Sequence, residues 1–362
     1  MSETQNMSET QNMSETQELR ELIFEQVENL YEKGYAYFDL IELGYFTEEE
    51  ILDIQTTCLN SYYKYFTDRG IKREDVEIDL SKKMETNKYF KQPKDSPMFK
   101  AMYGDVSKAG NEYINCRNPA NAMNCGMGRA TSQKEIYYNK SLNEYTERLR
   151  PLYNALYRHP VKRHLARFGL KLPHKKSKDM VAHTDMSYCE EVKENGAVLK
   201  DADDPTARAP YSKKGINMRI QSVLGLSNSE SGWYGYSGSH KKYNEIGEAI
   251  KWPGLKRTPQ QIPIEVLEKL GLERVDIPTK IGRLIIWNCG IVHGNSPCKD
   301  RPRLVKYINF QPDLKNTTAD RIIGLGNQPN EEKSKQIEKI SKSAQIALDA
   351  HLNKTNVCYK KK

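Results

Sequence analysis

The chain has 362 residues, of which 37% are hydrophobic, so it is long enough for one large domain or two modest ones. We expect a single elaborated domain. Its 56 Lys and Arg residues outnumber 48 Asp and Glu residues, which gives a net charge of +8. The basic residues are spread along the chain, apart from short clusters such as HKKSK and YKKK. This mild bias favours anionic partners only weakly and argues against a dedicated nucleic-acid groove.

Seven cysteines form an odd set without a Cys-x-x-Cys pair. This pattern argues against a disulfide framework or a zinc ribbon and favours a reducing compartment. The first residues lack both a cationic start and an apolar run, so we expect no signal peptide. No stretch approaches the length of a membrane span, and no peroxisomal Ser-Lys-Leu signal is present. Together these features predict a cytoplasmic protein without a membrane partner.

The N-terminal region combines a polar repeat with helical patterns. Residues 1–17 repeat a polar hexapeptide that has no apolar face, and we expect them to be disordered. In ELRELIFEQVENLYEKG the apolar residues recur at helical spacing, which predicts an amphipathic helix ending at Gly34. A short strand and a turn follow. The next helix is predicted to begin after Thr47, with Glu50 three positions on as in a capping box.

The rest of the chain divides into helical, loop and strand patterns. Residues 60–130 read as insertions and substrate-facing loops, and residues 139–168 are helical in character, with breaks near Pro151 and Pro160. Residues 190–214 form a charged loop or lid, residues 263–272 a short helix, and residues 330–362 a helix with a basic tail. Short apolar runs separated by Gly, Pro and Asn predict an antiparallel barrel or sandwich. These runs are MVAHTDMSY, MRIQSVLGLS, GWYGYSGSH, ERVDIPT, GRLIIWNCGIVHG and LVKYINFQP.

One of these runs places His183 two positions before Asp185. Residues i and i+2 of a strand face the same side, so the imidazole and the carboxylate would point to a common site. Two His and one Asp on one side of a metal leave three positions open, as in non-haem Fe(II) oxygenases. A zinc site that includes Cys189 or Cys289 is the alternative. Taken alone, the His-x-Asp pair is a weak signal.

Seven histidines limit the choice of a third ligand. His293 follows the apolar run GRLIIWNCGIV and precedes DRPRLVKYINF, whereas His240 stands in YSGSHKK. Either residue could also be a structural histidine. The other four histidines stand in basic, helical or loop surroundings and read as exposed residues: His159, His164, His174 and His351.

Several motifs in order give the chain a family resemblance. They are GYAYFDLIELGYFTEEEILDI, HTDMSY, QSVLGLSNSESGWYGYSGSHKK and GRLIIWNCGIVHGNSPCKDRPRLVKYINFQP, within residues 34–312. Together they resemble the phytanoyl-CoA dioxygenase superfamily of Fe(II)- and 2-oxoglutarate-dependent oxygenases. The joint order of His-x-Asp, GSHK and a histidine followed by RPRxxxxxNF makes the resemblance specific.

The resemblance implies a mainly β fold with flanking helices: a double-stranded β-helix, or cupin-like jelly roll, within residues 18–329. His183, Asp185 and His293 match the metal triad of the family. Arg303 matches the arginine that binds the far carboxylate of 2-oxoglutarate, and a planar guanidinium suits that task because it forms two parallel hydrogen bonds. His240 matches a position that is usually structural.

The chain also departs from the family pattern around the cosubstrate. His293 and Arg303 are ten positions apart, one fewer than in the family, so Arg301 is an alternative anchor. Gln221 stands where many relatives have an aromatic residue lining the 2-oxoglutarate pocket, and we assign it to that pocket. Arg283 stands where an acidic residue is common.

By resemblance, the cofactor is Fe(2+) and the cosubstrates are 2-oxoglutarate and O2. The reaction would hydroxylate an unidentified substrate while 2-oxoglutarate is decarboxylated to succinate and CO2. Related halogenases replace the carboxylate with a small residue, so the presence of Asp185 favours hydroxylation. We expect a small-molecule substrate, with nucleic acid or protein as alternatives, and no coenzyme A signature points to phytanoyl-CoA. Two other hypotheses are a cupin-like metal-binding protein without oxygenase activity and a nucleic-acid or protein interaction module.

Overall fold

The computed structural model describes most of the region between residues 21 and 312. The described residues are 21–83, 139–157, 160–173, 177–185, 220–251 and 260–312, with isolated positions 97, 342, 345 and 346. The predicted disordered repeat 1–17 and the charged loop 190–214 lie outside them. Almost all of the predicted C-terminal segment 330–362 lies outside them as well.

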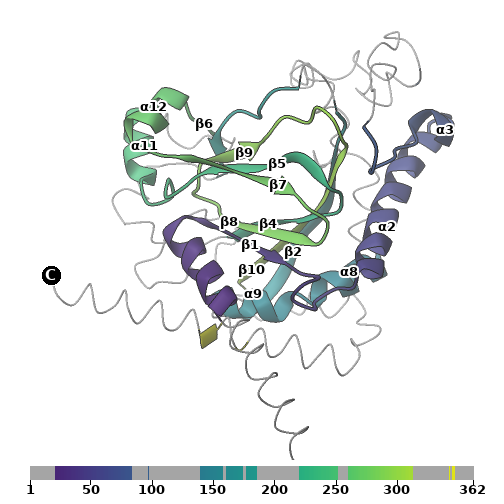
Figure 1. The fold of residues 1–362 in the computed structure, drawn as a ribbon, viewed down its shortest axis with the longest axis horizontal. Coiled ribbons are helices and arrows are strands. Elements are labelled where there is room, and N and C mark those ends of the chain that lie inside the picture. The colour runs from purple at the N-terminus through teal and green to yellow at the C-terminus, as the bar shows by residue number, and fades with distance from the viewer. Residues whose placement is uncertain are drawn as a thin grey trace, which may run out of the picture.

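Two antiparallel sheets of five strands each form the centre of the fold (Figure 1). The first sheet has the order β1 (Tyr35–Asp39), β8 (Arg283–Asn288), β4 (Ile220–Gly225), β10 (Arg303–Pro312) and β2 (Val161–Lys171). The second has the order β6 (Gln260–Gln261), β3 (His183–Thr184), β9 (His293–Asn295), β5 (Ser229–Tyr236) and β7 (Arg274–Thr279).

The strand pairing identifies the topology. Apart from β1 and β6, the strands pair from the outside inward: β2 with β10, β3 with β9, β4 with β8, and β5 with β7. This is the pairing of one long hairpin that is rolled across two sheets, which defines a jelly roll. The predicted fold class, a mainly β jelly-roll core with flanking helices, is therefore confirmed.

Strand β8 shows how the sequence separates the two sides of the first sheet. Leu284 and Ile286 belong to the core between this sheet and the helices, whereas Ile285 and Trp287 belong to the core between the two sheets. This alternation follows from the period of two in a strand. A strand buried on both faces reads as a continuous apolar run, as LIIW does here.

The two N-terminal helices follow the predicted pattern closely. Residues 21–32 are helical and bury Ile23, Val27 and Leu30, although Leu22 is 44% exposed. Helix α2 (Glu48–Thr67) begins with the predicted capping box, in which the Thr47 side chain accepts from the Glu50 backbone N–H and the Glu50 carboxylate accepts from the Thr47 backbone N–H. Both helices cover the outer face of the first sheet, together with α8 (Lys140–Glu147) and α9 (Arg150–Tyr157).

Three shorter helices complete the described structure. Helix α3 (Arg73–Val76) follows α2, while α11 (Tyr243–Ala249) and α12 (Ile264–Lys269) pack beside the second sheet. Helix α12 lies within the predicted helix at residues 263–272. Helix α11 was not predicted from the sequence.

The helix predicted up to residue 168 is wrong beyond Pro160. Strand β2 begins at Val161 and pairs with β10 along almost its whole length. Pro160 cannot continue a helix, and the long antiparallel partner decides the conformation of the residues that follow.

The outer face of β10 carries a buried lysine. Lys306 is 1% exposed, and its Nζ donates to Thr146 Oγ1 at 2.7 Å. Burial lowers the pKa of Lys306 to about 8, and the charge of Arg163 acts in the same direction. A charged ammonium in this core costs free energy of folding because it loses its hydration.

We predict that Lys306→Met makes the free energy of unfolding less dependent on pH. The folded-state pKa of about 8 lies below the ordinary value of 10.5, so the wild-type lysine destabilises the fold below about pH 8 and loses this effect as pH rises towards 10.5. The variant should be more stable than wild type at about pH 7, and this difference should shrink by about pH 10. Urea titrations at both pH values measure it, and a constant difference would contradict the pKa shift.

Candidate metal centre

Strands β3 and β9 bring the predicted ligands together. His183 pairs directly with His293 across the two strands, and Asp185 follows β3. The Nε2 atom of His183 lies 3.6 Å from Asp185 Oδ1, and the Nε2 atom of His293 lies 3.5 Å from Asp185 Oδ2. One ligand atom from each residue lies within 4.8 Å of the other two. Among the described residues, this is the group that could hold a metal ion.

The orientation of both imidazoles is fixed by their own strands. His183 Nδ1 lies 2.9 Å from the carbonyl oxygen of Val181, and His293 Nδ1 lies 3.0 Å from that of Ile291. A carbonyl can only accept a hydrogen bond, so each Nδ1 serves as the donor and each Nε2 is the ring nitrogen directed at the site. Metal-binding histidines are typically oriented in this way.

The charge states of the group suit metal binding. Burial lowers the pKa of His183 to about 4, and the nearby His293 contributes in the same direction. Burial alone would raise the pKa of Asp185, but its contacts with His293, His183 and Gln221 hold it below the ordinary value. A neutral His183 and an ionised Asp185 are the forms that bind metal ions.

Aromatic side chains line the interior beside His293. Its ring centroid lies 5.4 Å from that of Trp287 and 6.3 Å from that of Trp233, with the Trp233 ring nearly parallel. Gln221 is opposite Trp287 in the pairing of β4 with β8. The indole nitrogens of both tryptophans and Gln221 Oε1 are buried and have no hydrogen-bond partner among the described residues. Since buried polar atoms are normally paired, this interior offers donors and an acceptor to a bound molecule.

The two candidate arginines lie in different environments. Arg303 is 5% exposed, and its Nε donates to Thr279 Oγ1 at 3.2 Å. Burial lowers the pKa of Arg303, and none of the carboxylates in the described part of the chain forms an ion pair with it. Arg301 is exposed and lines a surface pocket of about 510 Å³. Only Arg303 lies on the interior face of the jelly roll.

Two other residues considered from the sequence have structural contacts instead. His240 Nε2 lies 2.9 Å from the carbonyl oxygen of Tyr31, and its ring packs so closely on Gly34 that a Cβ there would lie 2.5 Å from Nδ1. Gly34 also has a φ of +88°, which a side chain would disfavour. Arg283 forms an ion pair with Asp39 of β1 at 3.2 Å. The described part of the chain therefore gives these residues roles in packing.

Of the two cysteines of the zinc alternative, the structure describes Cys289. Cys289 is buried and lies outside the group of possible ligands, and Cys189 lies outside the described residues. His159, His174 and His351 also lie outside them, as does the side chain of His164.

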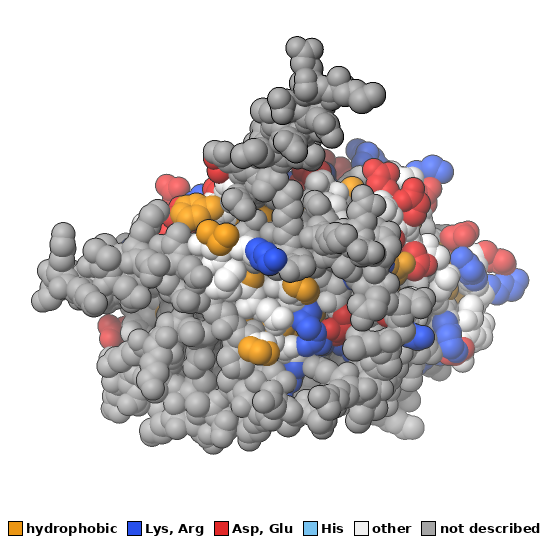
Figure 2. Space-filling view, turned by 90° about the horizontal axis from the view of Figure 1, so that it is seen from below, with side chains coloured by type: hydrophobic (Ala, Val, Ile, Leu, Met, Phe, Trp, Pro, Cys, Tyr) orange, Lys and Arg blue, Asp and Glu red, His pale blue; other side chains and the backbone are white. Residues whose placement is uncertain are grey.

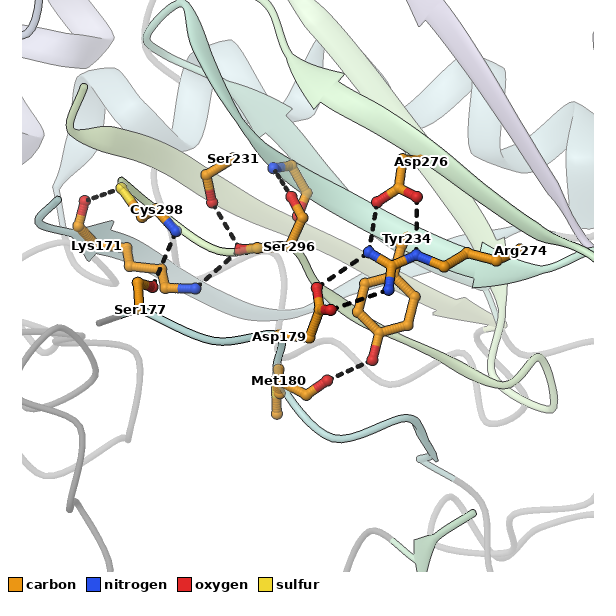
Figure 3. A network of polar contacts seen from close by, with 11 residues as sticks. Lys171, Ser177, Asp179, Met180, Ser231, Tyr234, Arg274, Asp276, Ser296 and Cys298 are labelled. Atoms are coloured by element: carbon orange, nitrogen blue, oxygen red, sulfur yellow. Dashed lines mark hydrogen bonds and ion pairs between the residues drawn. The ribbon is translucent and has the colours of Figure 1, made fainter. Parts of the chain in front are cut away.

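Asp179 and Met180, which precede His183, form hydrogen bonds with the second sheet (Figure 3). The Met180 N–H donates to the Asn295 carbonyl oxygen at 2.9 Å, and the Tyr234 hydroxyl donates to the Met180 carbonyl oxygen. Arg274 binds both carboxylate oxygens of Asp179, at 3.0 and 3.1 Å, and its guanidinium lies 4.0 Å from the centre of the Tyr234 ring. These contacts were not predicted from the sequence, because they join residues that are far apart along the chain.

The surface of the described residues shows no segregation of charge on the face seen in Figure 2. Basic and acidic side chains lie next to each other there, most clearly at the right-hand edge. Ion pairs such as Lys280 with Glu42, at 2.9 Å, reflect this mixing. A helix of sufficient length and apolarity to cross a membrane was not found in the described part of the chain.

Comparisons with known proteins give matches among solved structures alone. No protein-family model and no curated protein sequence matches the chain. The structure of AviO1 from Streptomyces viridochromogenes Tue57 is 13% identical, with a TM-score of 0.39, over 80% of this chain and 94% of that chain. EctD from S. alaskensis with 2-oxoglutarate and 5-hydroxyectoine is 15% identical, with a TM-score of 0.37, over 80% of this chain and 75% of that chain.

A third match is the epimerase SnoN in complex with Fe3+, alpha ketoglutarate and nogalamycin RO. It is 11% identical, with a TM-score of 0.40, over 85% of this chain and 92% of that chain. At TM-scores below 0.5, none of these similarities identifies the activity of this chain.

We predict that His183→Ala and Asp185→Ala each abolish stoichiometric binding of a divalent metal. Each change removes one of three donors, and the remaining two bind too weakly to retain the ion in dilute protein. Elemental analysis after gel filtration and a calorimetric Fe(II) titration under nitrogen measure the effect. His351→Ala, which leaves the three residues intact, is the control. Metal retained at one equivalent by folded His183→Ala would rule out this centre.

Proposed function

We propose that this chain is an Fe(II)- and 2-oxoglutarate-dependent dioxygenase that hydroxylates a small-molecule substrate. The observation that carries the proposal is the arrangement of His183, Asp185 and His293, whose ligand atoms converge within 4.8 Å. Two imidazoles and one carboxylate on one side of a metal leave the opposite side for cosubstrate and O2. We assign this activity to a single domain, residues 18–329. We also propose that the protein is cytoplasmic.

The ligand atoms of His183, Asp185 and His293 suit iron. The Nδ1 atom of each imidazole bonds to its own strand and leaves Nε2 toward the site, and Asp185 stays ionised, so no proton must be displaced from the carboxylate at neutral pH. When bound, iron would supply the redox chemistry, in which 2-oxoglutarate gives CO2 and succinate and the two atoms of O2 enter succinate and the substrate hydroxyl. The contribution of the protein is to place the reactants and exclude water.

Other residues of the interior have roles in holding the cosubstrate. Arg303 would bind its far carboxylate, since four of its five N–H groups are not used by Thr279. Gln221 holds Asp185 by a hydrogen bond, and its Oε1 faces no partner among the described residues. Trp233 and Trp287 would keep water from the reacting atoms, because both are almost fully buried beside His293.

An anaerobic titration with Fe(II) and 2-oxoglutarate tests the proposal. We expect a visible charge-transfer band that requires both components, followed by formation of succinate when O2 is admitted. A protein that binds Fe(II) but gives neither the band nor succinate would instead fit the cupin-like protein without oxygenase activity. Steeply salt-dependent binding of DNA or RNA without metal binding would favour the interaction module.

We predict that Arg303→Ala weakens 2-oxoglutarate binding by about a hundredfold and leaves Fe(II) binding unchanged. The variant loses a bidentate charge-assisted contact in a buried site, which is worth about 2–3 kcal/mol. The matched control is Arg301→Ala, which removes the exposed arginine two positions earlier. Titration of the charge-transfer band gives both affinities. If Arg301→Ala weakens 2-oxoglutarate binding and Arg303→Ala does not, Arg301 would be the residue that binds the far carboxylate.

A further inference from the structure

A second buried cation lies beside Arg303. Lys171 is the last residue of β2 and pairs directly with Arg303 of β10. Directly opposite residues of antiparallel strands have side chains on the same face of the sheet. Both side chains are 5% exposed. The interior of the jelly roll therefore holds a lysine and an arginine next to each other.

Both cations reach across the interior to the second sheet. Lys171 Nζ donates to the carbonyl oxygen of Ser296 at 2.9 Å, just after β9, and Arg303 Nε donates to Thr279 Oγ1 at the end of β7. Figure 3 shows the lysine pointing to Ser296, whose carbonyl oxygen also accepts from Ser231 Oγ at 2.9 Å. The two cations are thus held in place by neutral groups.

Neither cation has its hydrogen-bonding capacity filled. An ammonium has three N–H donors and a guanidinium has five, yet each side chain makes one hydrogen bond within the described part of the chain. No carboxylate there forms an ion pair with either one. Asp179, the acidic residue that also influences Lys171, is bound to Arg274.

The electrostatic environment of the pair is unfavourable without an anion. Burial and, to a smaller extent, the charge of Arg303 lower the pKa of Lys171 to about 8. Two like charges in a poorly hydrated interior repel each other and lose hydration. A bound carboxylate between them would relieve both effects, because its oxygens can accept from the guanidinium and the ammonium together.

We propose that Lys171 is a specificity-determining residue that binds the far carboxylate of the cosubstrate together with Arg303. The inference rests on the proposed function, which identifies the anion as the second carboxylate of a 2-oxo diacid. Two cations for one carboxylate make the interior strongly selective for diacids over 2-oxo acids that end in a methyl group. Lys171 would contribute to the affinity and selectivity for the cosubstrate. Metal binding by His183, Asp185 and His293 would not depend on it.

The test compares two cosubstrates in three proteins. The probes are 2-oxoglutarate and 2-oxovalerate, which has the same number of carbons but a methyl end, titrated anaerobically into the Fe(II) protein by the charge-transfer band. The variants are Lys171→Gln, which removes the charge but can still donate to Ser296, and Lys306→Met. The second variant is the matched control because Lys306 is an equally buried lysine on the opposite face of the first sheet.

We expect Lys171→Gln to raise the Kd for 2-oxoglutarate by about tenfold or more. Its Kd for 2-oxovalerate should stay within about twofold of wild type, and Lys306→Met should leave both values near wild type. Lys171→Arg should recover part of the affinity for 2-oxoglutarate, because it restores the charge. Fe(II) affinity and thermal melting, measured in parallel, separate these effects from misfolding.

Two results would overturn the inference. If wild type gives the band and Lys171→Gln binds 2-oxoglutarate as tightly as wild type, the role of Lys171 is wrong and the proposed function stands. If wild type gives no band with 2-oxoglutarate, the proposed function fails and this inference fails with it. If Lys171→Gln does not fold, the two Kd values of the wild-type protein provide the test. Similar Kd values for 2-oxoglutarate and 2-oxovalerate would also contradict a two-cation site.

Discussion

The candidate site depends on the backbone pairing of His183 with His293. This register joins β3 to β9, two short strands from distant parts of the chain, and sets both imidazoles on one face. A slip by one residue would turn either histidine to the opposite face of the sheet. Strand β3 has only two residues, so the pairing itself is brief, and the register is secured by Met180, Asp179 and their partners on the second sheet.

The interior of the jelly roll contains two regions that differ in charge. The candidate metal centre combines two imidazoles with one ionised carboxylate, whereas Lys171 and Arg303 provide positive charge near Ser296. A molecule with a metal-chelating end and an anionic end would satisfy both parts. The hydrophobic rings of Trp233 and Trp287 lie between the two sheets and reduce screening by water, which strengthens each interaction.

Much of the fold could be predicted from the sequence, because LIIW in β8 and similar apolar runs mark strands buried on both faces. His183 and Asp185 were recognisable from their spacing, but His293 was linked to them through the family resemblance, since no local pattern reports a contact across 110 positions. The first part of β2 was predicted as helical up to residue 168, and the buried cation Arg163 interrupts its apolar alternation. That error concealed the position of Lys171 opposite Arg303.

Strand β1 lies outside the eight-strand jelly roll and covers β8 at one edge of the first sheet. Without it, β8 would present unpaired backbone groups along a segment whose side chains are almost all buried and apolar. Such an edge invites pairing with another chain. The N-terminal helix and β1, joined at Gly34 against His240, therefore protect the barrel from self-association, and a shortened chain that begins after β1 would be prone to aggregate.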